Sequence, residues 1–222
     1  MTMATSDPLH AETRQRLLEA AGEAFAGHGF RAATIRDICQ RAKANIAAVN
    51  YYFRDKEHLY AAVLQYAQSC ADEKYPSDLG LQTDATAEER LHAFVRSFLL
   101  HIFDEGQPAW HGKLWSREMI EPTRALDALV ETPIRPSAER LEAIVRALLG
   151  GRATHEQVRL CATSIVSQCL FYHHARPVIV RLYPEQRFGA QSIERLADHI
   201  TRFSLGALKQ IAQEQKGPAR RC

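Results

Sequence analysis

The sequence predicts an all-α protein, with a helix-turn-helix domain of three helices followed by a C-terminal helical bundle. Apolar residues recur at spacings of three and four along almost the whole chain. The one β-like run, residues 178–182, is too isolated to build a sheet. Glycine and proline residues divide the chain into segments of helical length, which gives about nine helices.

Composition and charge exclude several classes of protein. Hydrophobic residues make up 46% and charged residues 24% of the 222 residues, which excludes wholesale disorder. No apolar stretch approaches the ~18 residues of a membrane span, and the first nine residues do not resemble a secretory signal. We therefore expect a cytoplasmic protein that makes no use of a membrane.

The five cysteines are widely spaced and contain no C-x-x-C pair, which is typical of reduced, mostly buried thiols. Redox sensing by Cys161 and Cys169 is the alternative. On one helix these two residues would lie about 12 Å apart, too far for a disulfide.

Four helices are expected in the first 74 residues. The first covers residues 11–26 and ends at Gly27 and Gly29. The next three begin at Thr34, Asn45 and Asp55, residue types that cap helix N-termini. The second stops near residue 42, and the fourth runs to about residue 74.

The second and third of these helices have the pattern of a helix-turn-helix. The small side chains of Ala47 and Ala48 would allow the third helix to approach base edges closely. Asn50 can pair with adenine, and Tyr51 can reach a base or a phosphate. Between residues 31 and 56 there are six basic and two acidic residues, so positive charge is concentrated where phosphates would be met. Alternatively, the arginines of this segment form only a solvated face.

Five longer helices are expected after this region, at residues 87–103, 110–120, 123–149, 155–174 and 191–214. Prolines at positions 133 and 136 predict a kink or break in the third of them. We expect a DNA-binding domain at residues 1–55, a linker helix and loop at 56–83, a ligand-binding and dimerisation domain at 84–215, and a basic tail at 216–222.

The N-terminal residues resemble the signature of the TetR/AcrR transcriptional regulators over about residues 12–63. The residues that carry the resemblance are Phe30, Ala33, Thr34, Ile35, Asp37, Ile38, Ala42, Asn45, Ala48, Val49, Tyr51, Tyr52, Phe53, Lys56 and Leu59. The resemblance implies an all-helical, two-fold dimer that binds double-stranded operator DNA and a small-molecule effector, with no cofactor. A repressor released from a palindromic operator by an apolar or amphipathic effector is the expected form, although an activator is also compatible.

The resemblance also implies roles for individual residues. Thr34, Tyr52 and Lys56 match phosphate contacts, Asn45 matches the cap of the recognition helix, and Asn50 and Tyr51 match positions that face the groove. Tyr52 could instead serve packing. Lys43 stands where glycine is common, which would strain a left-handed backbone. The expected DNA-binding set is Thr34, Arg36, Lys43, Asn45, Ala48, Asn50, Tyr51, Tyr52 and Lys56.

The C-terminal half resembles a subgroup with a CecR-like domain, on short matches at residues 117–118, 122–123, 168–171 and 175–177. Aromatic and polar residues are dense here, as in pockets that are mostly apolar with a few polar groups. The expected ligand-binding set is Phe103, Trp110, Trp115, Arg117, Glu118, Met119, Gln168, Phe171, Tyr172 and His173. The alternative is a packed core that holds an Arg117–Glu118 ion pair.

The last two long helices have wide apolar surfaces, which requires burial on two sides. We expect one side to face the core and the other a second copy of the chain. The expected dimer-interface set is Ala162, Ile165, Val166, Cys169, Ile193, Ala197, Ile200, Ser204, Leu208 and Ile211. A helix fully internal to one chain is the alternative.

Other function classes find little support. The sequence has no nucleophile elbow, phosphate-binding loop or dinucleotide motif, so we expect no enzyme. Adjacent His173 and His174 would point about 100° apart on a helix and cannot readily share a metal ion, so no metal site is expected. His10 and His28 are expected to be ordinary surface residues. A helical interaction module that no longer binds DNA remains the alternative function.

Overall fold

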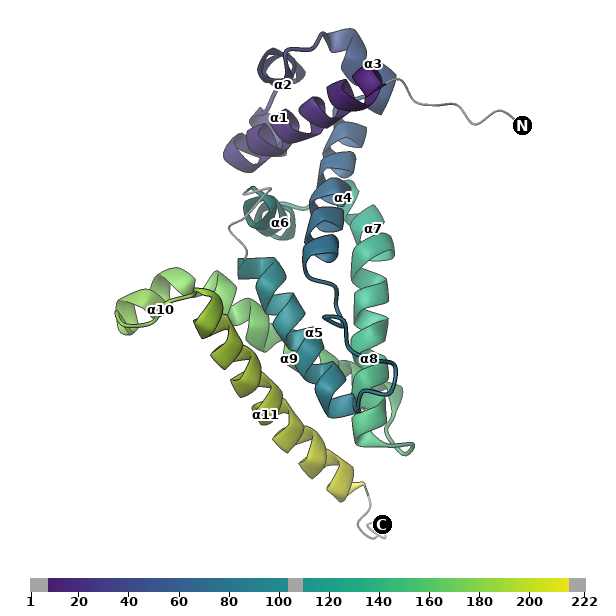
Figure 1. Cartoon of the computed structure of the whole chain (residues 1–222), viewed down its shortest axis with the longest axis vertical. Coiled ribbons are helices and arrows are strands. Elements are labelled where there is room, and N and C mark those ends of the chain that lie inside the picture. Colours follow the sequence, from purple (N-terminus) through teal and green to yellow (C-terminus); the bar gives the residue numbers. More distant parts are fainter. Residues whose placement is uncertain (1–7, 104–109, 216–222) are drawn as a thin grey trace, which may run out of the picture. The chain divides into compact units, whose positions relative to one another are not determined.

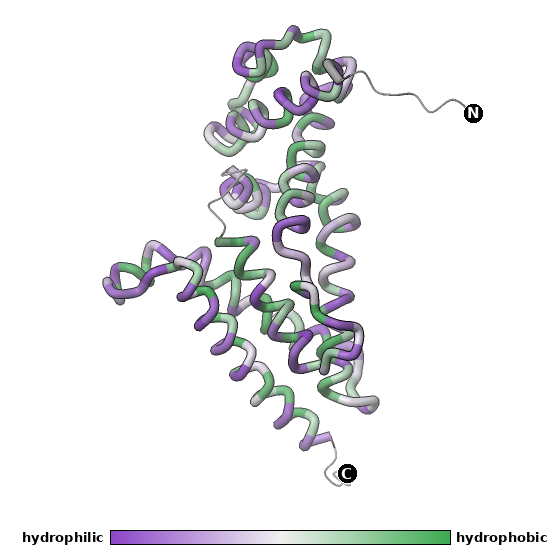
Figure 2. Tube along the Cα trace, in the orientation of Figure 1, coloured by the Kyte–Doolittle hydropathy of each residue, from purple (hydrophilic) through white to green (hydrophobic). Residues whose placement is uncertain are grey.

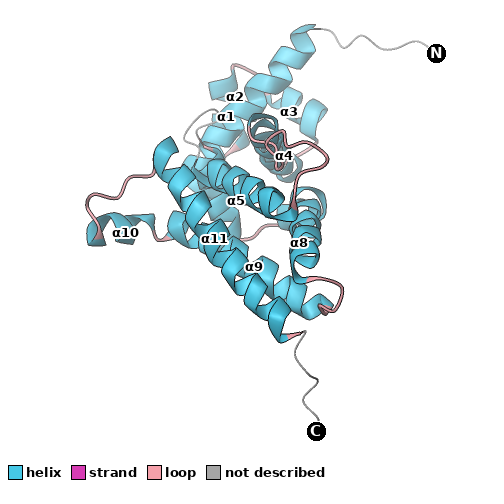
Figure 3. Ribbon diagram, turned by 60° about the horizontal axis from the view of Figure 1, so that its bottom comes forward, coloured by secondary structure: helices cyan, strands magenta, loops and turns pink. Residues whose placement is uncertain are grey.

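The computed structural model describes residues 8–103 and 110–215, and this part of the chain consists of helices and loops without strands (Figure 3). The expected all-α fold class is confirmed. The chain forms two compact units, each built from two stretches of sequence. Unit 1 comprises the described parts of Met1–Glu73 and Glu105–Pro133, and unit 2 those of Lys74–Asp104 and Ile134–Cys222. The predicted basic tail lies outside the described residues.

Unit 1 begins with four helices, labelled in Figure 1: α1 (Pro8–Ala32), α2 (Ile35–Ala42), α3 (Ile46–Phe53) and α4 (Lys56–Lys74). The three expected N-caps are confirmed. Thr34 Oγ1 accepts from the Asp37 N–H, Asn45 Oδ1 from the Ala48 N–H, and Asp55 Oδ1 from the His58 N–H. These bonds satisfy helix N–H groups that would otherwise lack a partner.

The first helix differs from the expectation at its end. Helical hydrogen bonding continues to Ala32, although Gly29 has a φ of 81° and interrupts the regular backbone. Glycine is suited to this conformation because it has no Cβ. The predicted stop at Gly27 and Gly29 is therefore a break within α1, and a short turn follows it.

Unit 1 also contains α6 (His111–Ile120) and α7 (Ala125–Leu129), which follow in sequence only after α5 of the other unit. The helix α6 packs on α1. Trp110, just before α6, lies flat against Gly22 of α1, where an added Cβ would be 2.2 Å from the indole ring. Unit 1 is thus completed by a segment that the sequence analysis assigned to the ligand-binding domain.

Unit 2 consists of α5 (Ala87–Phe103), α8 (Arg135–Leu149), α9 (His155–His174), α10 (Arg176–Leu182) and α11 (Ala190–Glu214). The expected break near residue 133 is confirmed, because a π-helical segment, Val130–Ile134, holds Pro133 between α7 and α8. The β-like run at residues 178–182 is part of the short helix α10. Pro177 lies in the first turn of that helix, where its missing N–H costs nothing.

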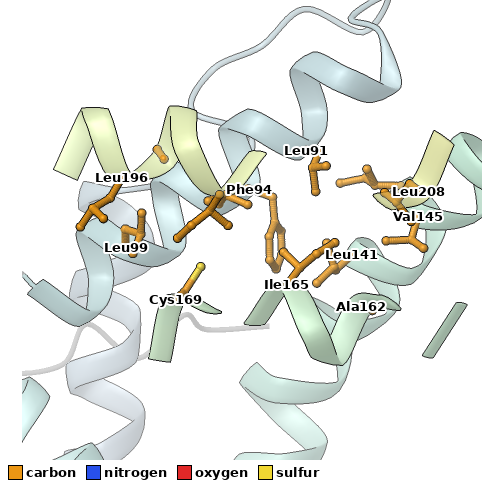
Figure 4. Close-up of a cluster of buried hydrophobic side chains, with 14 of the residues drawn as sticks. Leu91, Phe94, Leu99, Leu141, Val145, Ala162, Ile165, Cys169, Leu196 and Leu208 are labelled. Atoms are coloured by element: carbon orange, nitrogen blue, oxygen red, sulfur yellow. The ribbon is translucent and has the colours of Figure 1, made fainter. Parts of the chain in front are cut away.

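The core of unit 2 lies between α5, α8, α9 and α11 (Figure 4). Leu91, Leu99, Leu141 and Ile165 are almost completely buried in it. Each such side chain contributes roughly 1.5–3 kcal/mol by leaving water. Along α11, hydrophobic and hydrophilic residues alternate (Figure 2), as expected of a helix with one buried face.

Most members of the expected dimer-interface set lie in the core of unit 2. Eight of its ten members are buried within one chain: Ala162, Ile165, Cys169, Ile193, Ala197, Ile200, Ser204 and Leu208. The other two, Val166 and Ile211, are half-buried at the edge of the same core. The eight buried members therefore offer little surface to a partner, whereas Val166 and Ile211 keep some. Spacing identified a true apolar stripe, but this stripe faces inward.

None of the described helices is both long enough and apolar enough to cross a lipid bilayer.

Candidate DNA-binding surface and effector region

The outward face of α3 carries the residues expected to read DNA. Val49 and Phe53 are buried and hold the helix against unit 1, which leaves Ala47, Asn50 and Tyr51 exposed. The Tyr51 side chain is 72% exposed, an unusual state for a large aromatic residue without a partner. Small residues beside exposed Asn and Tyr form a surface that suits close contact with base edges.

Polar and basic groups surround this face. Thr34, Arg36, Lys43 and Asn45 are exposed, whereas Ala48 is half-buried. Lys43 has φ 50° and ψ 44°, and its N–H bonds to the carbonyls of Cys39 and Gln40. The left-handed backbone considered for Lys43 is therefore present.

Two of the expected phosphate contacts also have partners inside unit 1. The Lys56 Nζ lies 4.8 Å from the centre of the Phe30 ring and donates to the Arg31 carbonyl at 3.3 Å. Partial burial lowers the pKa of Lys56. Tyr52 is half-buried and its ring lies 4.9 Å from that of Tyr51, so a packing role accompanies any contact with DNA.

One residue beside α3 was not singled out by the sequence. The exposed imidazole of His10, in the first turns of α1, meets Tyr51 and Tyr52 edge-on at ring distances of 6.0 and 6.3 Å. His10 was expected to be an ordinary surface histidine. Its place depends on how α1 crosses α3, which no local pattern reveals.

The expected ligand-binding residues divide between the two units, so the structure does not bring them together within one body. Phe103, Gln168, Phe171, Tyr172 and His173 belong to unit 2, and the others to unit 1. In unit 2 the Phe103 ring stacks on Phe188 at 5.0 Å and meets His173 at 5.6 Å. Burial lowers the pKa of His173. Phe171 is exposed, and Gln168 donates to Ser204 at 3.3 Å.

In unit 1, Arg117 and Glu118 attach α6 to two other helices. Arg117 donates at 3.0 Å to the carbonyls of Ala26 and of Gly27, next to the break in α1. Glu118 has no exposed surface and accepts from the Tyr60 hydroxyl of α4 at 2.8 Å. Burial, followed by this hydrogen bond, raises the pKa of Tyr60.

Glu118 therefore requires a correction on both expectations. Its oxygens also accept from the N–H and the hydroxyl of Thr123, so the carboxylate is fully enclosed by protein donors rather than open to a ligand. Among the described residues it makes no ion pair with Arg117 either. Buried charge of this kind persists where several donors satisfy it, and it then fixes the arrangement of the elements that supply them.

Two hollows lie on unit 2, of about 480 and 320 Å³. The first is lined by Glu142, His155, Glu156 and Arg159, and the second by residues that include Leu79, Leu81, His92, Arg96 and Glu194. Neither contains a member of the expected ligand-binding set.

Beside the second hollow, ligand atoms of His92, Glu194 and Asp198 lie within 4.8 Å of one another. His92 pairs with Asp198 at 2.9 Å and Arg96 with Glu194. Because Arg96 already pairs with Glu194, we interpret the group as one ion pair and one His92–Asp198 hydrogen bond that join α5 to α11.

The cysteines of the described part are unpaired, as expected. Cys39 and Cys169 are buried, and Cys70 and Cys161 half-buried. Burial raises the pKa of Cys39 and Cys161, and that of Cys169 to about 12. Since the thiolate is the reactive form, these environments disfavour redox sensing by Cys161 and Cys169.

Comparison with known protein families gives two matches that together span most of the chain. Residues 17–63 match the model of bacterial regulatory proteins of the tetR family. Residues 87–208 match the C-terminal domain of the HTH-type transcriptional dual regulator CecR. The second match includes α6 and α7, which fold within unit 1.

Individual relatives agree with these matches. The CecR regulator of Shigella flexneri is 25% identical over 204 residues, which cover 86% of this chain and 88% of that protein. A transcriptional regulator from Saccharomonospora viridis, solved with choline, is 19% identical, with a TM-score of 0.62 over 87% of this chain and 95% of that one. AibR, solved with isovaleryl coenzyme A and operator DNA, is 18% identical, with a TM-score of 0.62 over 86% and 97%. At these identities the two structures establish a shared fold.

Proposed function

Because the chain belongs to the TetR family of bacterial regulatory proteins and has a CecR-type C-terminal domain, we propose that it is a ligand-responsive transcriptional repressor. It binds a palindromic operator as a homodimer, and a small apolar or amphipathic effector releases it. The observation that carries the proposal is the exposed outward face of α3, with Asn50 and Tyr51 beside small residues and a surplus of basic groups.

The proposed dimer uses the outward sides of α9 and α11 instead of the inward stripe. Leu160 of α9 is 58% exposed and Phe203 of α11 is 63% exposed. Near Phe203, Gly206 and Ala207 are also exposed, and an added Cβ on Gly206 would meet nothing within 4 Å. Glycine within a helix costs about 1 kcal/mol relative to alanine, and its own chain does not require it there. Close approach of a partner helix explains both the exposed aromatic and the glycine.

The proposed effector acts on α6. This helix belongs to the CecR-type region by sequence, yet Arg117 binds α1 next to its break and Glu118 binds Tyr60 of α4. An effector that binds two conformations of α6 unequally would therefore change the position of α1 and α4, and α1 packs on α2 and α3. A coupling free energy of ~1–3 kcal/mol is sufficient for a 5- to 150-fold change in operator affinity.

The structures with choline and with isovaleryl coenzyme A indicate that this fold accommodates organic effectors of different charge. For this chain, the ring of Phe103 at the end of α5 stacks on Phe188 and meets His173 of α9, and this aromatic group favours an effector with an apolar part.

Fluorescence anisotropy with duplex DNA from upstream of its own gene tests the proposal, in a salt series with random-sequence competitor. We expect binding that resists the competitor and weakens steeply as salt rises. Tyr51→Ala should abolish the resistance to competitor while the protein stays dimeric. The matched control is Tyr183→Ala, at an exposed tyrosine directly after α10. A folded dimer that binds no DNA at any salt concentration would instead indicate an interaction module.

A further inference from the structure

His10, Tyr51 and Tyr52 form a group of three rings, here called the His10 cluster, on the outer side of α3. The rings of His10 and Tyr51 are inclined by 82°, those of His10 and Tyr52 by 84°, and the two tyrosine rings by 84°. Each contact is therefore edge to face, a favourable geometry for aromatic rings. The imidazole of His10 thus has its ring centre 6.0 Å from that of Tyr51, a side chain of α3 that is 72% exposed.

Among the described residues, no carboxylate is paired with the His10 imidazole. The helix α3 contains no acidic residue, and on α1 the nearest carboxylate, Glu12, pairs with Arg16 at 3.9 Å. The Arg14 guanidinium, four residues after His10 on α1, lies 5.3 Å from the Phe53 ring centre of α3. A tyrosine face accepts a cation, so the rings themselves do not oppose protonation.

We infer that His10 is a further DNA-contacting residue, whose protonated imidazole pairs with a backbone phosphate at the edge of the groove that α3 enters. This inference rests on the proposed function. Imidazole titrates near neutral pH, and a phosphate beside it favours the charged form over the neutral one. DNA binding by this chain is thus coupled to the uptake of a proton, independently of base sequence.

The test measures DNA affinity at pH 6.0 and pH 8.0 with the full chain, using a random-sequence duplex at low salt and the upstream duplex. From pH 8.0 to pH 6.0 the DNA affinity of both proteins is compared as a ratio, and we expect the ratio for the wild-type protein to be about ten times the ratio for His10→Gln. A change of this size is what one proton-linked contact can supply. At pH 6.0 the salt slope of His10→Gln should be smaller by about 0.9, the value for one phosphate. His10→Arg should bind tightly at both pH values.

Two control variants separate His10 from other histidines of unit 1. His28 is exposed on the same helix and distant in sequence from the cluster, so His28→Gln should keep the wild-type pH dependence. His58 lies at the start of α4 and bonds to Asp55 at 2.7 Å. His58→Gln measures how much His58 contributes to the pH dependence of DNA affinity.

A wild-type pH dependence in His10→Gln would overturn the inference, and so would an equal loss of affinity at both pH values, which indicates packing alone. If the wild-type protein itself binds neither duplex at any pH, the proposed function fails. That outcome is distinct from DNA binding that is merely insensitive to His10.

Discussion

At the scale of the residue, the most informative position is Lys43, the left-handed end of α2. A lysine in this conformation is strained by about 1–2 kcal/mol, because its Cβ crowds the following carbonyl. Glycine would relieve the strain, yet here the position carries a positive charge beside the exposed face of α3. Phosphate binding by Lys43 is a physical reason for a costly residue to stand there.

We predict that Lys43→Gly raises the stability to unfolding by about 0.5–1 kcal/mol, because relief of strain exceeds the added freedom of the unfolded chain. The same variant should bind DNA more weakly, with a salt slope reduced by about 0.9. Urea denaturation and anisotropy measure the two effects. Lys43→Ala is the control, since it removes the charge and keeps the strained backbone, and it should lose affinity without gaining stability. Unchanged DNA binding by both variants would exclude a phosphate contact.

Local chemistry explains why the N-terminal site was predictable. The caps at Thr34, Asn45 and Asp55 each bond within three residues, so their geometry follows from the sequence around them. The exposure of Asn50 and Tyr51 follows from the burial of Val49 and Phe53 on the same short helix. His10 lies about forty residues from its ring partners, and only the tertiary structure brings it to α3.

At the scale of the element, α6 is the part of the molecule whose role the sequence did not reveal. Arg117 and Glu118 were predicted to bind a ligand because they are polar residues in an apolar region. In the structure, Arg117 bonds to α1 and Glu118 bonds to α4, so the two residues attach α6 to these helices. The hydrogen-bond partners of these two residues lie far away in the sequence, so no local sequence pattern reveals them. The sequence alone therefore could not distinguish ligand binding from the attachment of α6.

We predict that Tyr60→Phe separates DNA binding from its control. The substitution removes the hydrogen bond to Glu118 and leaves the ring packed on Phe25 and Phe30. An enclosed carboxylate that loses one donor costs about 1–3 kcal/mol, measurable as a lower melting temperature. Operator affinity without effector should change little, whereas the release of DNA by an effector should weaken at least several-fold.

The control for this variant is Tyr66→Phe, which removes another α4 hydroxyl, one that accepts from Gln15 at 2.6 Å instead of binding α6. It should leave effector response intact. Equal responses in wild type, Tyr60→Phe and Tyr66→Phe would show that the Glu118 bond does not transmit the signal.

At the scale of the whole molecule, the two faces of α11 decide how copies of the chain associate. Spacing correctly marked two apolar stripes on this helix, but periodicity does not say which stripe faces inward. Leu208 and Ile200 pack in the core of unit 2, whereas Phe203 is exposed. The fold class was therefore predictable from periodicity, whereas the side of α11 that meets a second copy was not, and the dimer surface stays a proposal.

We predict that Phe203→Glu produces folded monomers, because it places a charge at the centre of the proposed dimer surface without disturbing the core. Light scattering after size exclusion measures the mass, and circular dichroism reports the fold. Leu182→Glu, at the equally exposed end of α10, is the matched control and should remain dimeric. Leu208→Glu should instead unfold unit 2. A dimer that survives Phe203→Glu would place the contact on another surface.

The interleaved order of the two units has a consequence for exchanging parts between regulators. A graft that keeps this chain to residue 83 and takes everything after it from another protein would supply foreign partners for Gly22, for the Ala26 and Gly27 carbonyls, and for Tyr60. Any recombination of such modules, in the laboratory or during evolution, must carry the α6–α7 segment together with the first four helices. A chimaera that keeps each unit intact therefore needs three junctions in the chain, near residues 73, 104 and 133, rather than one.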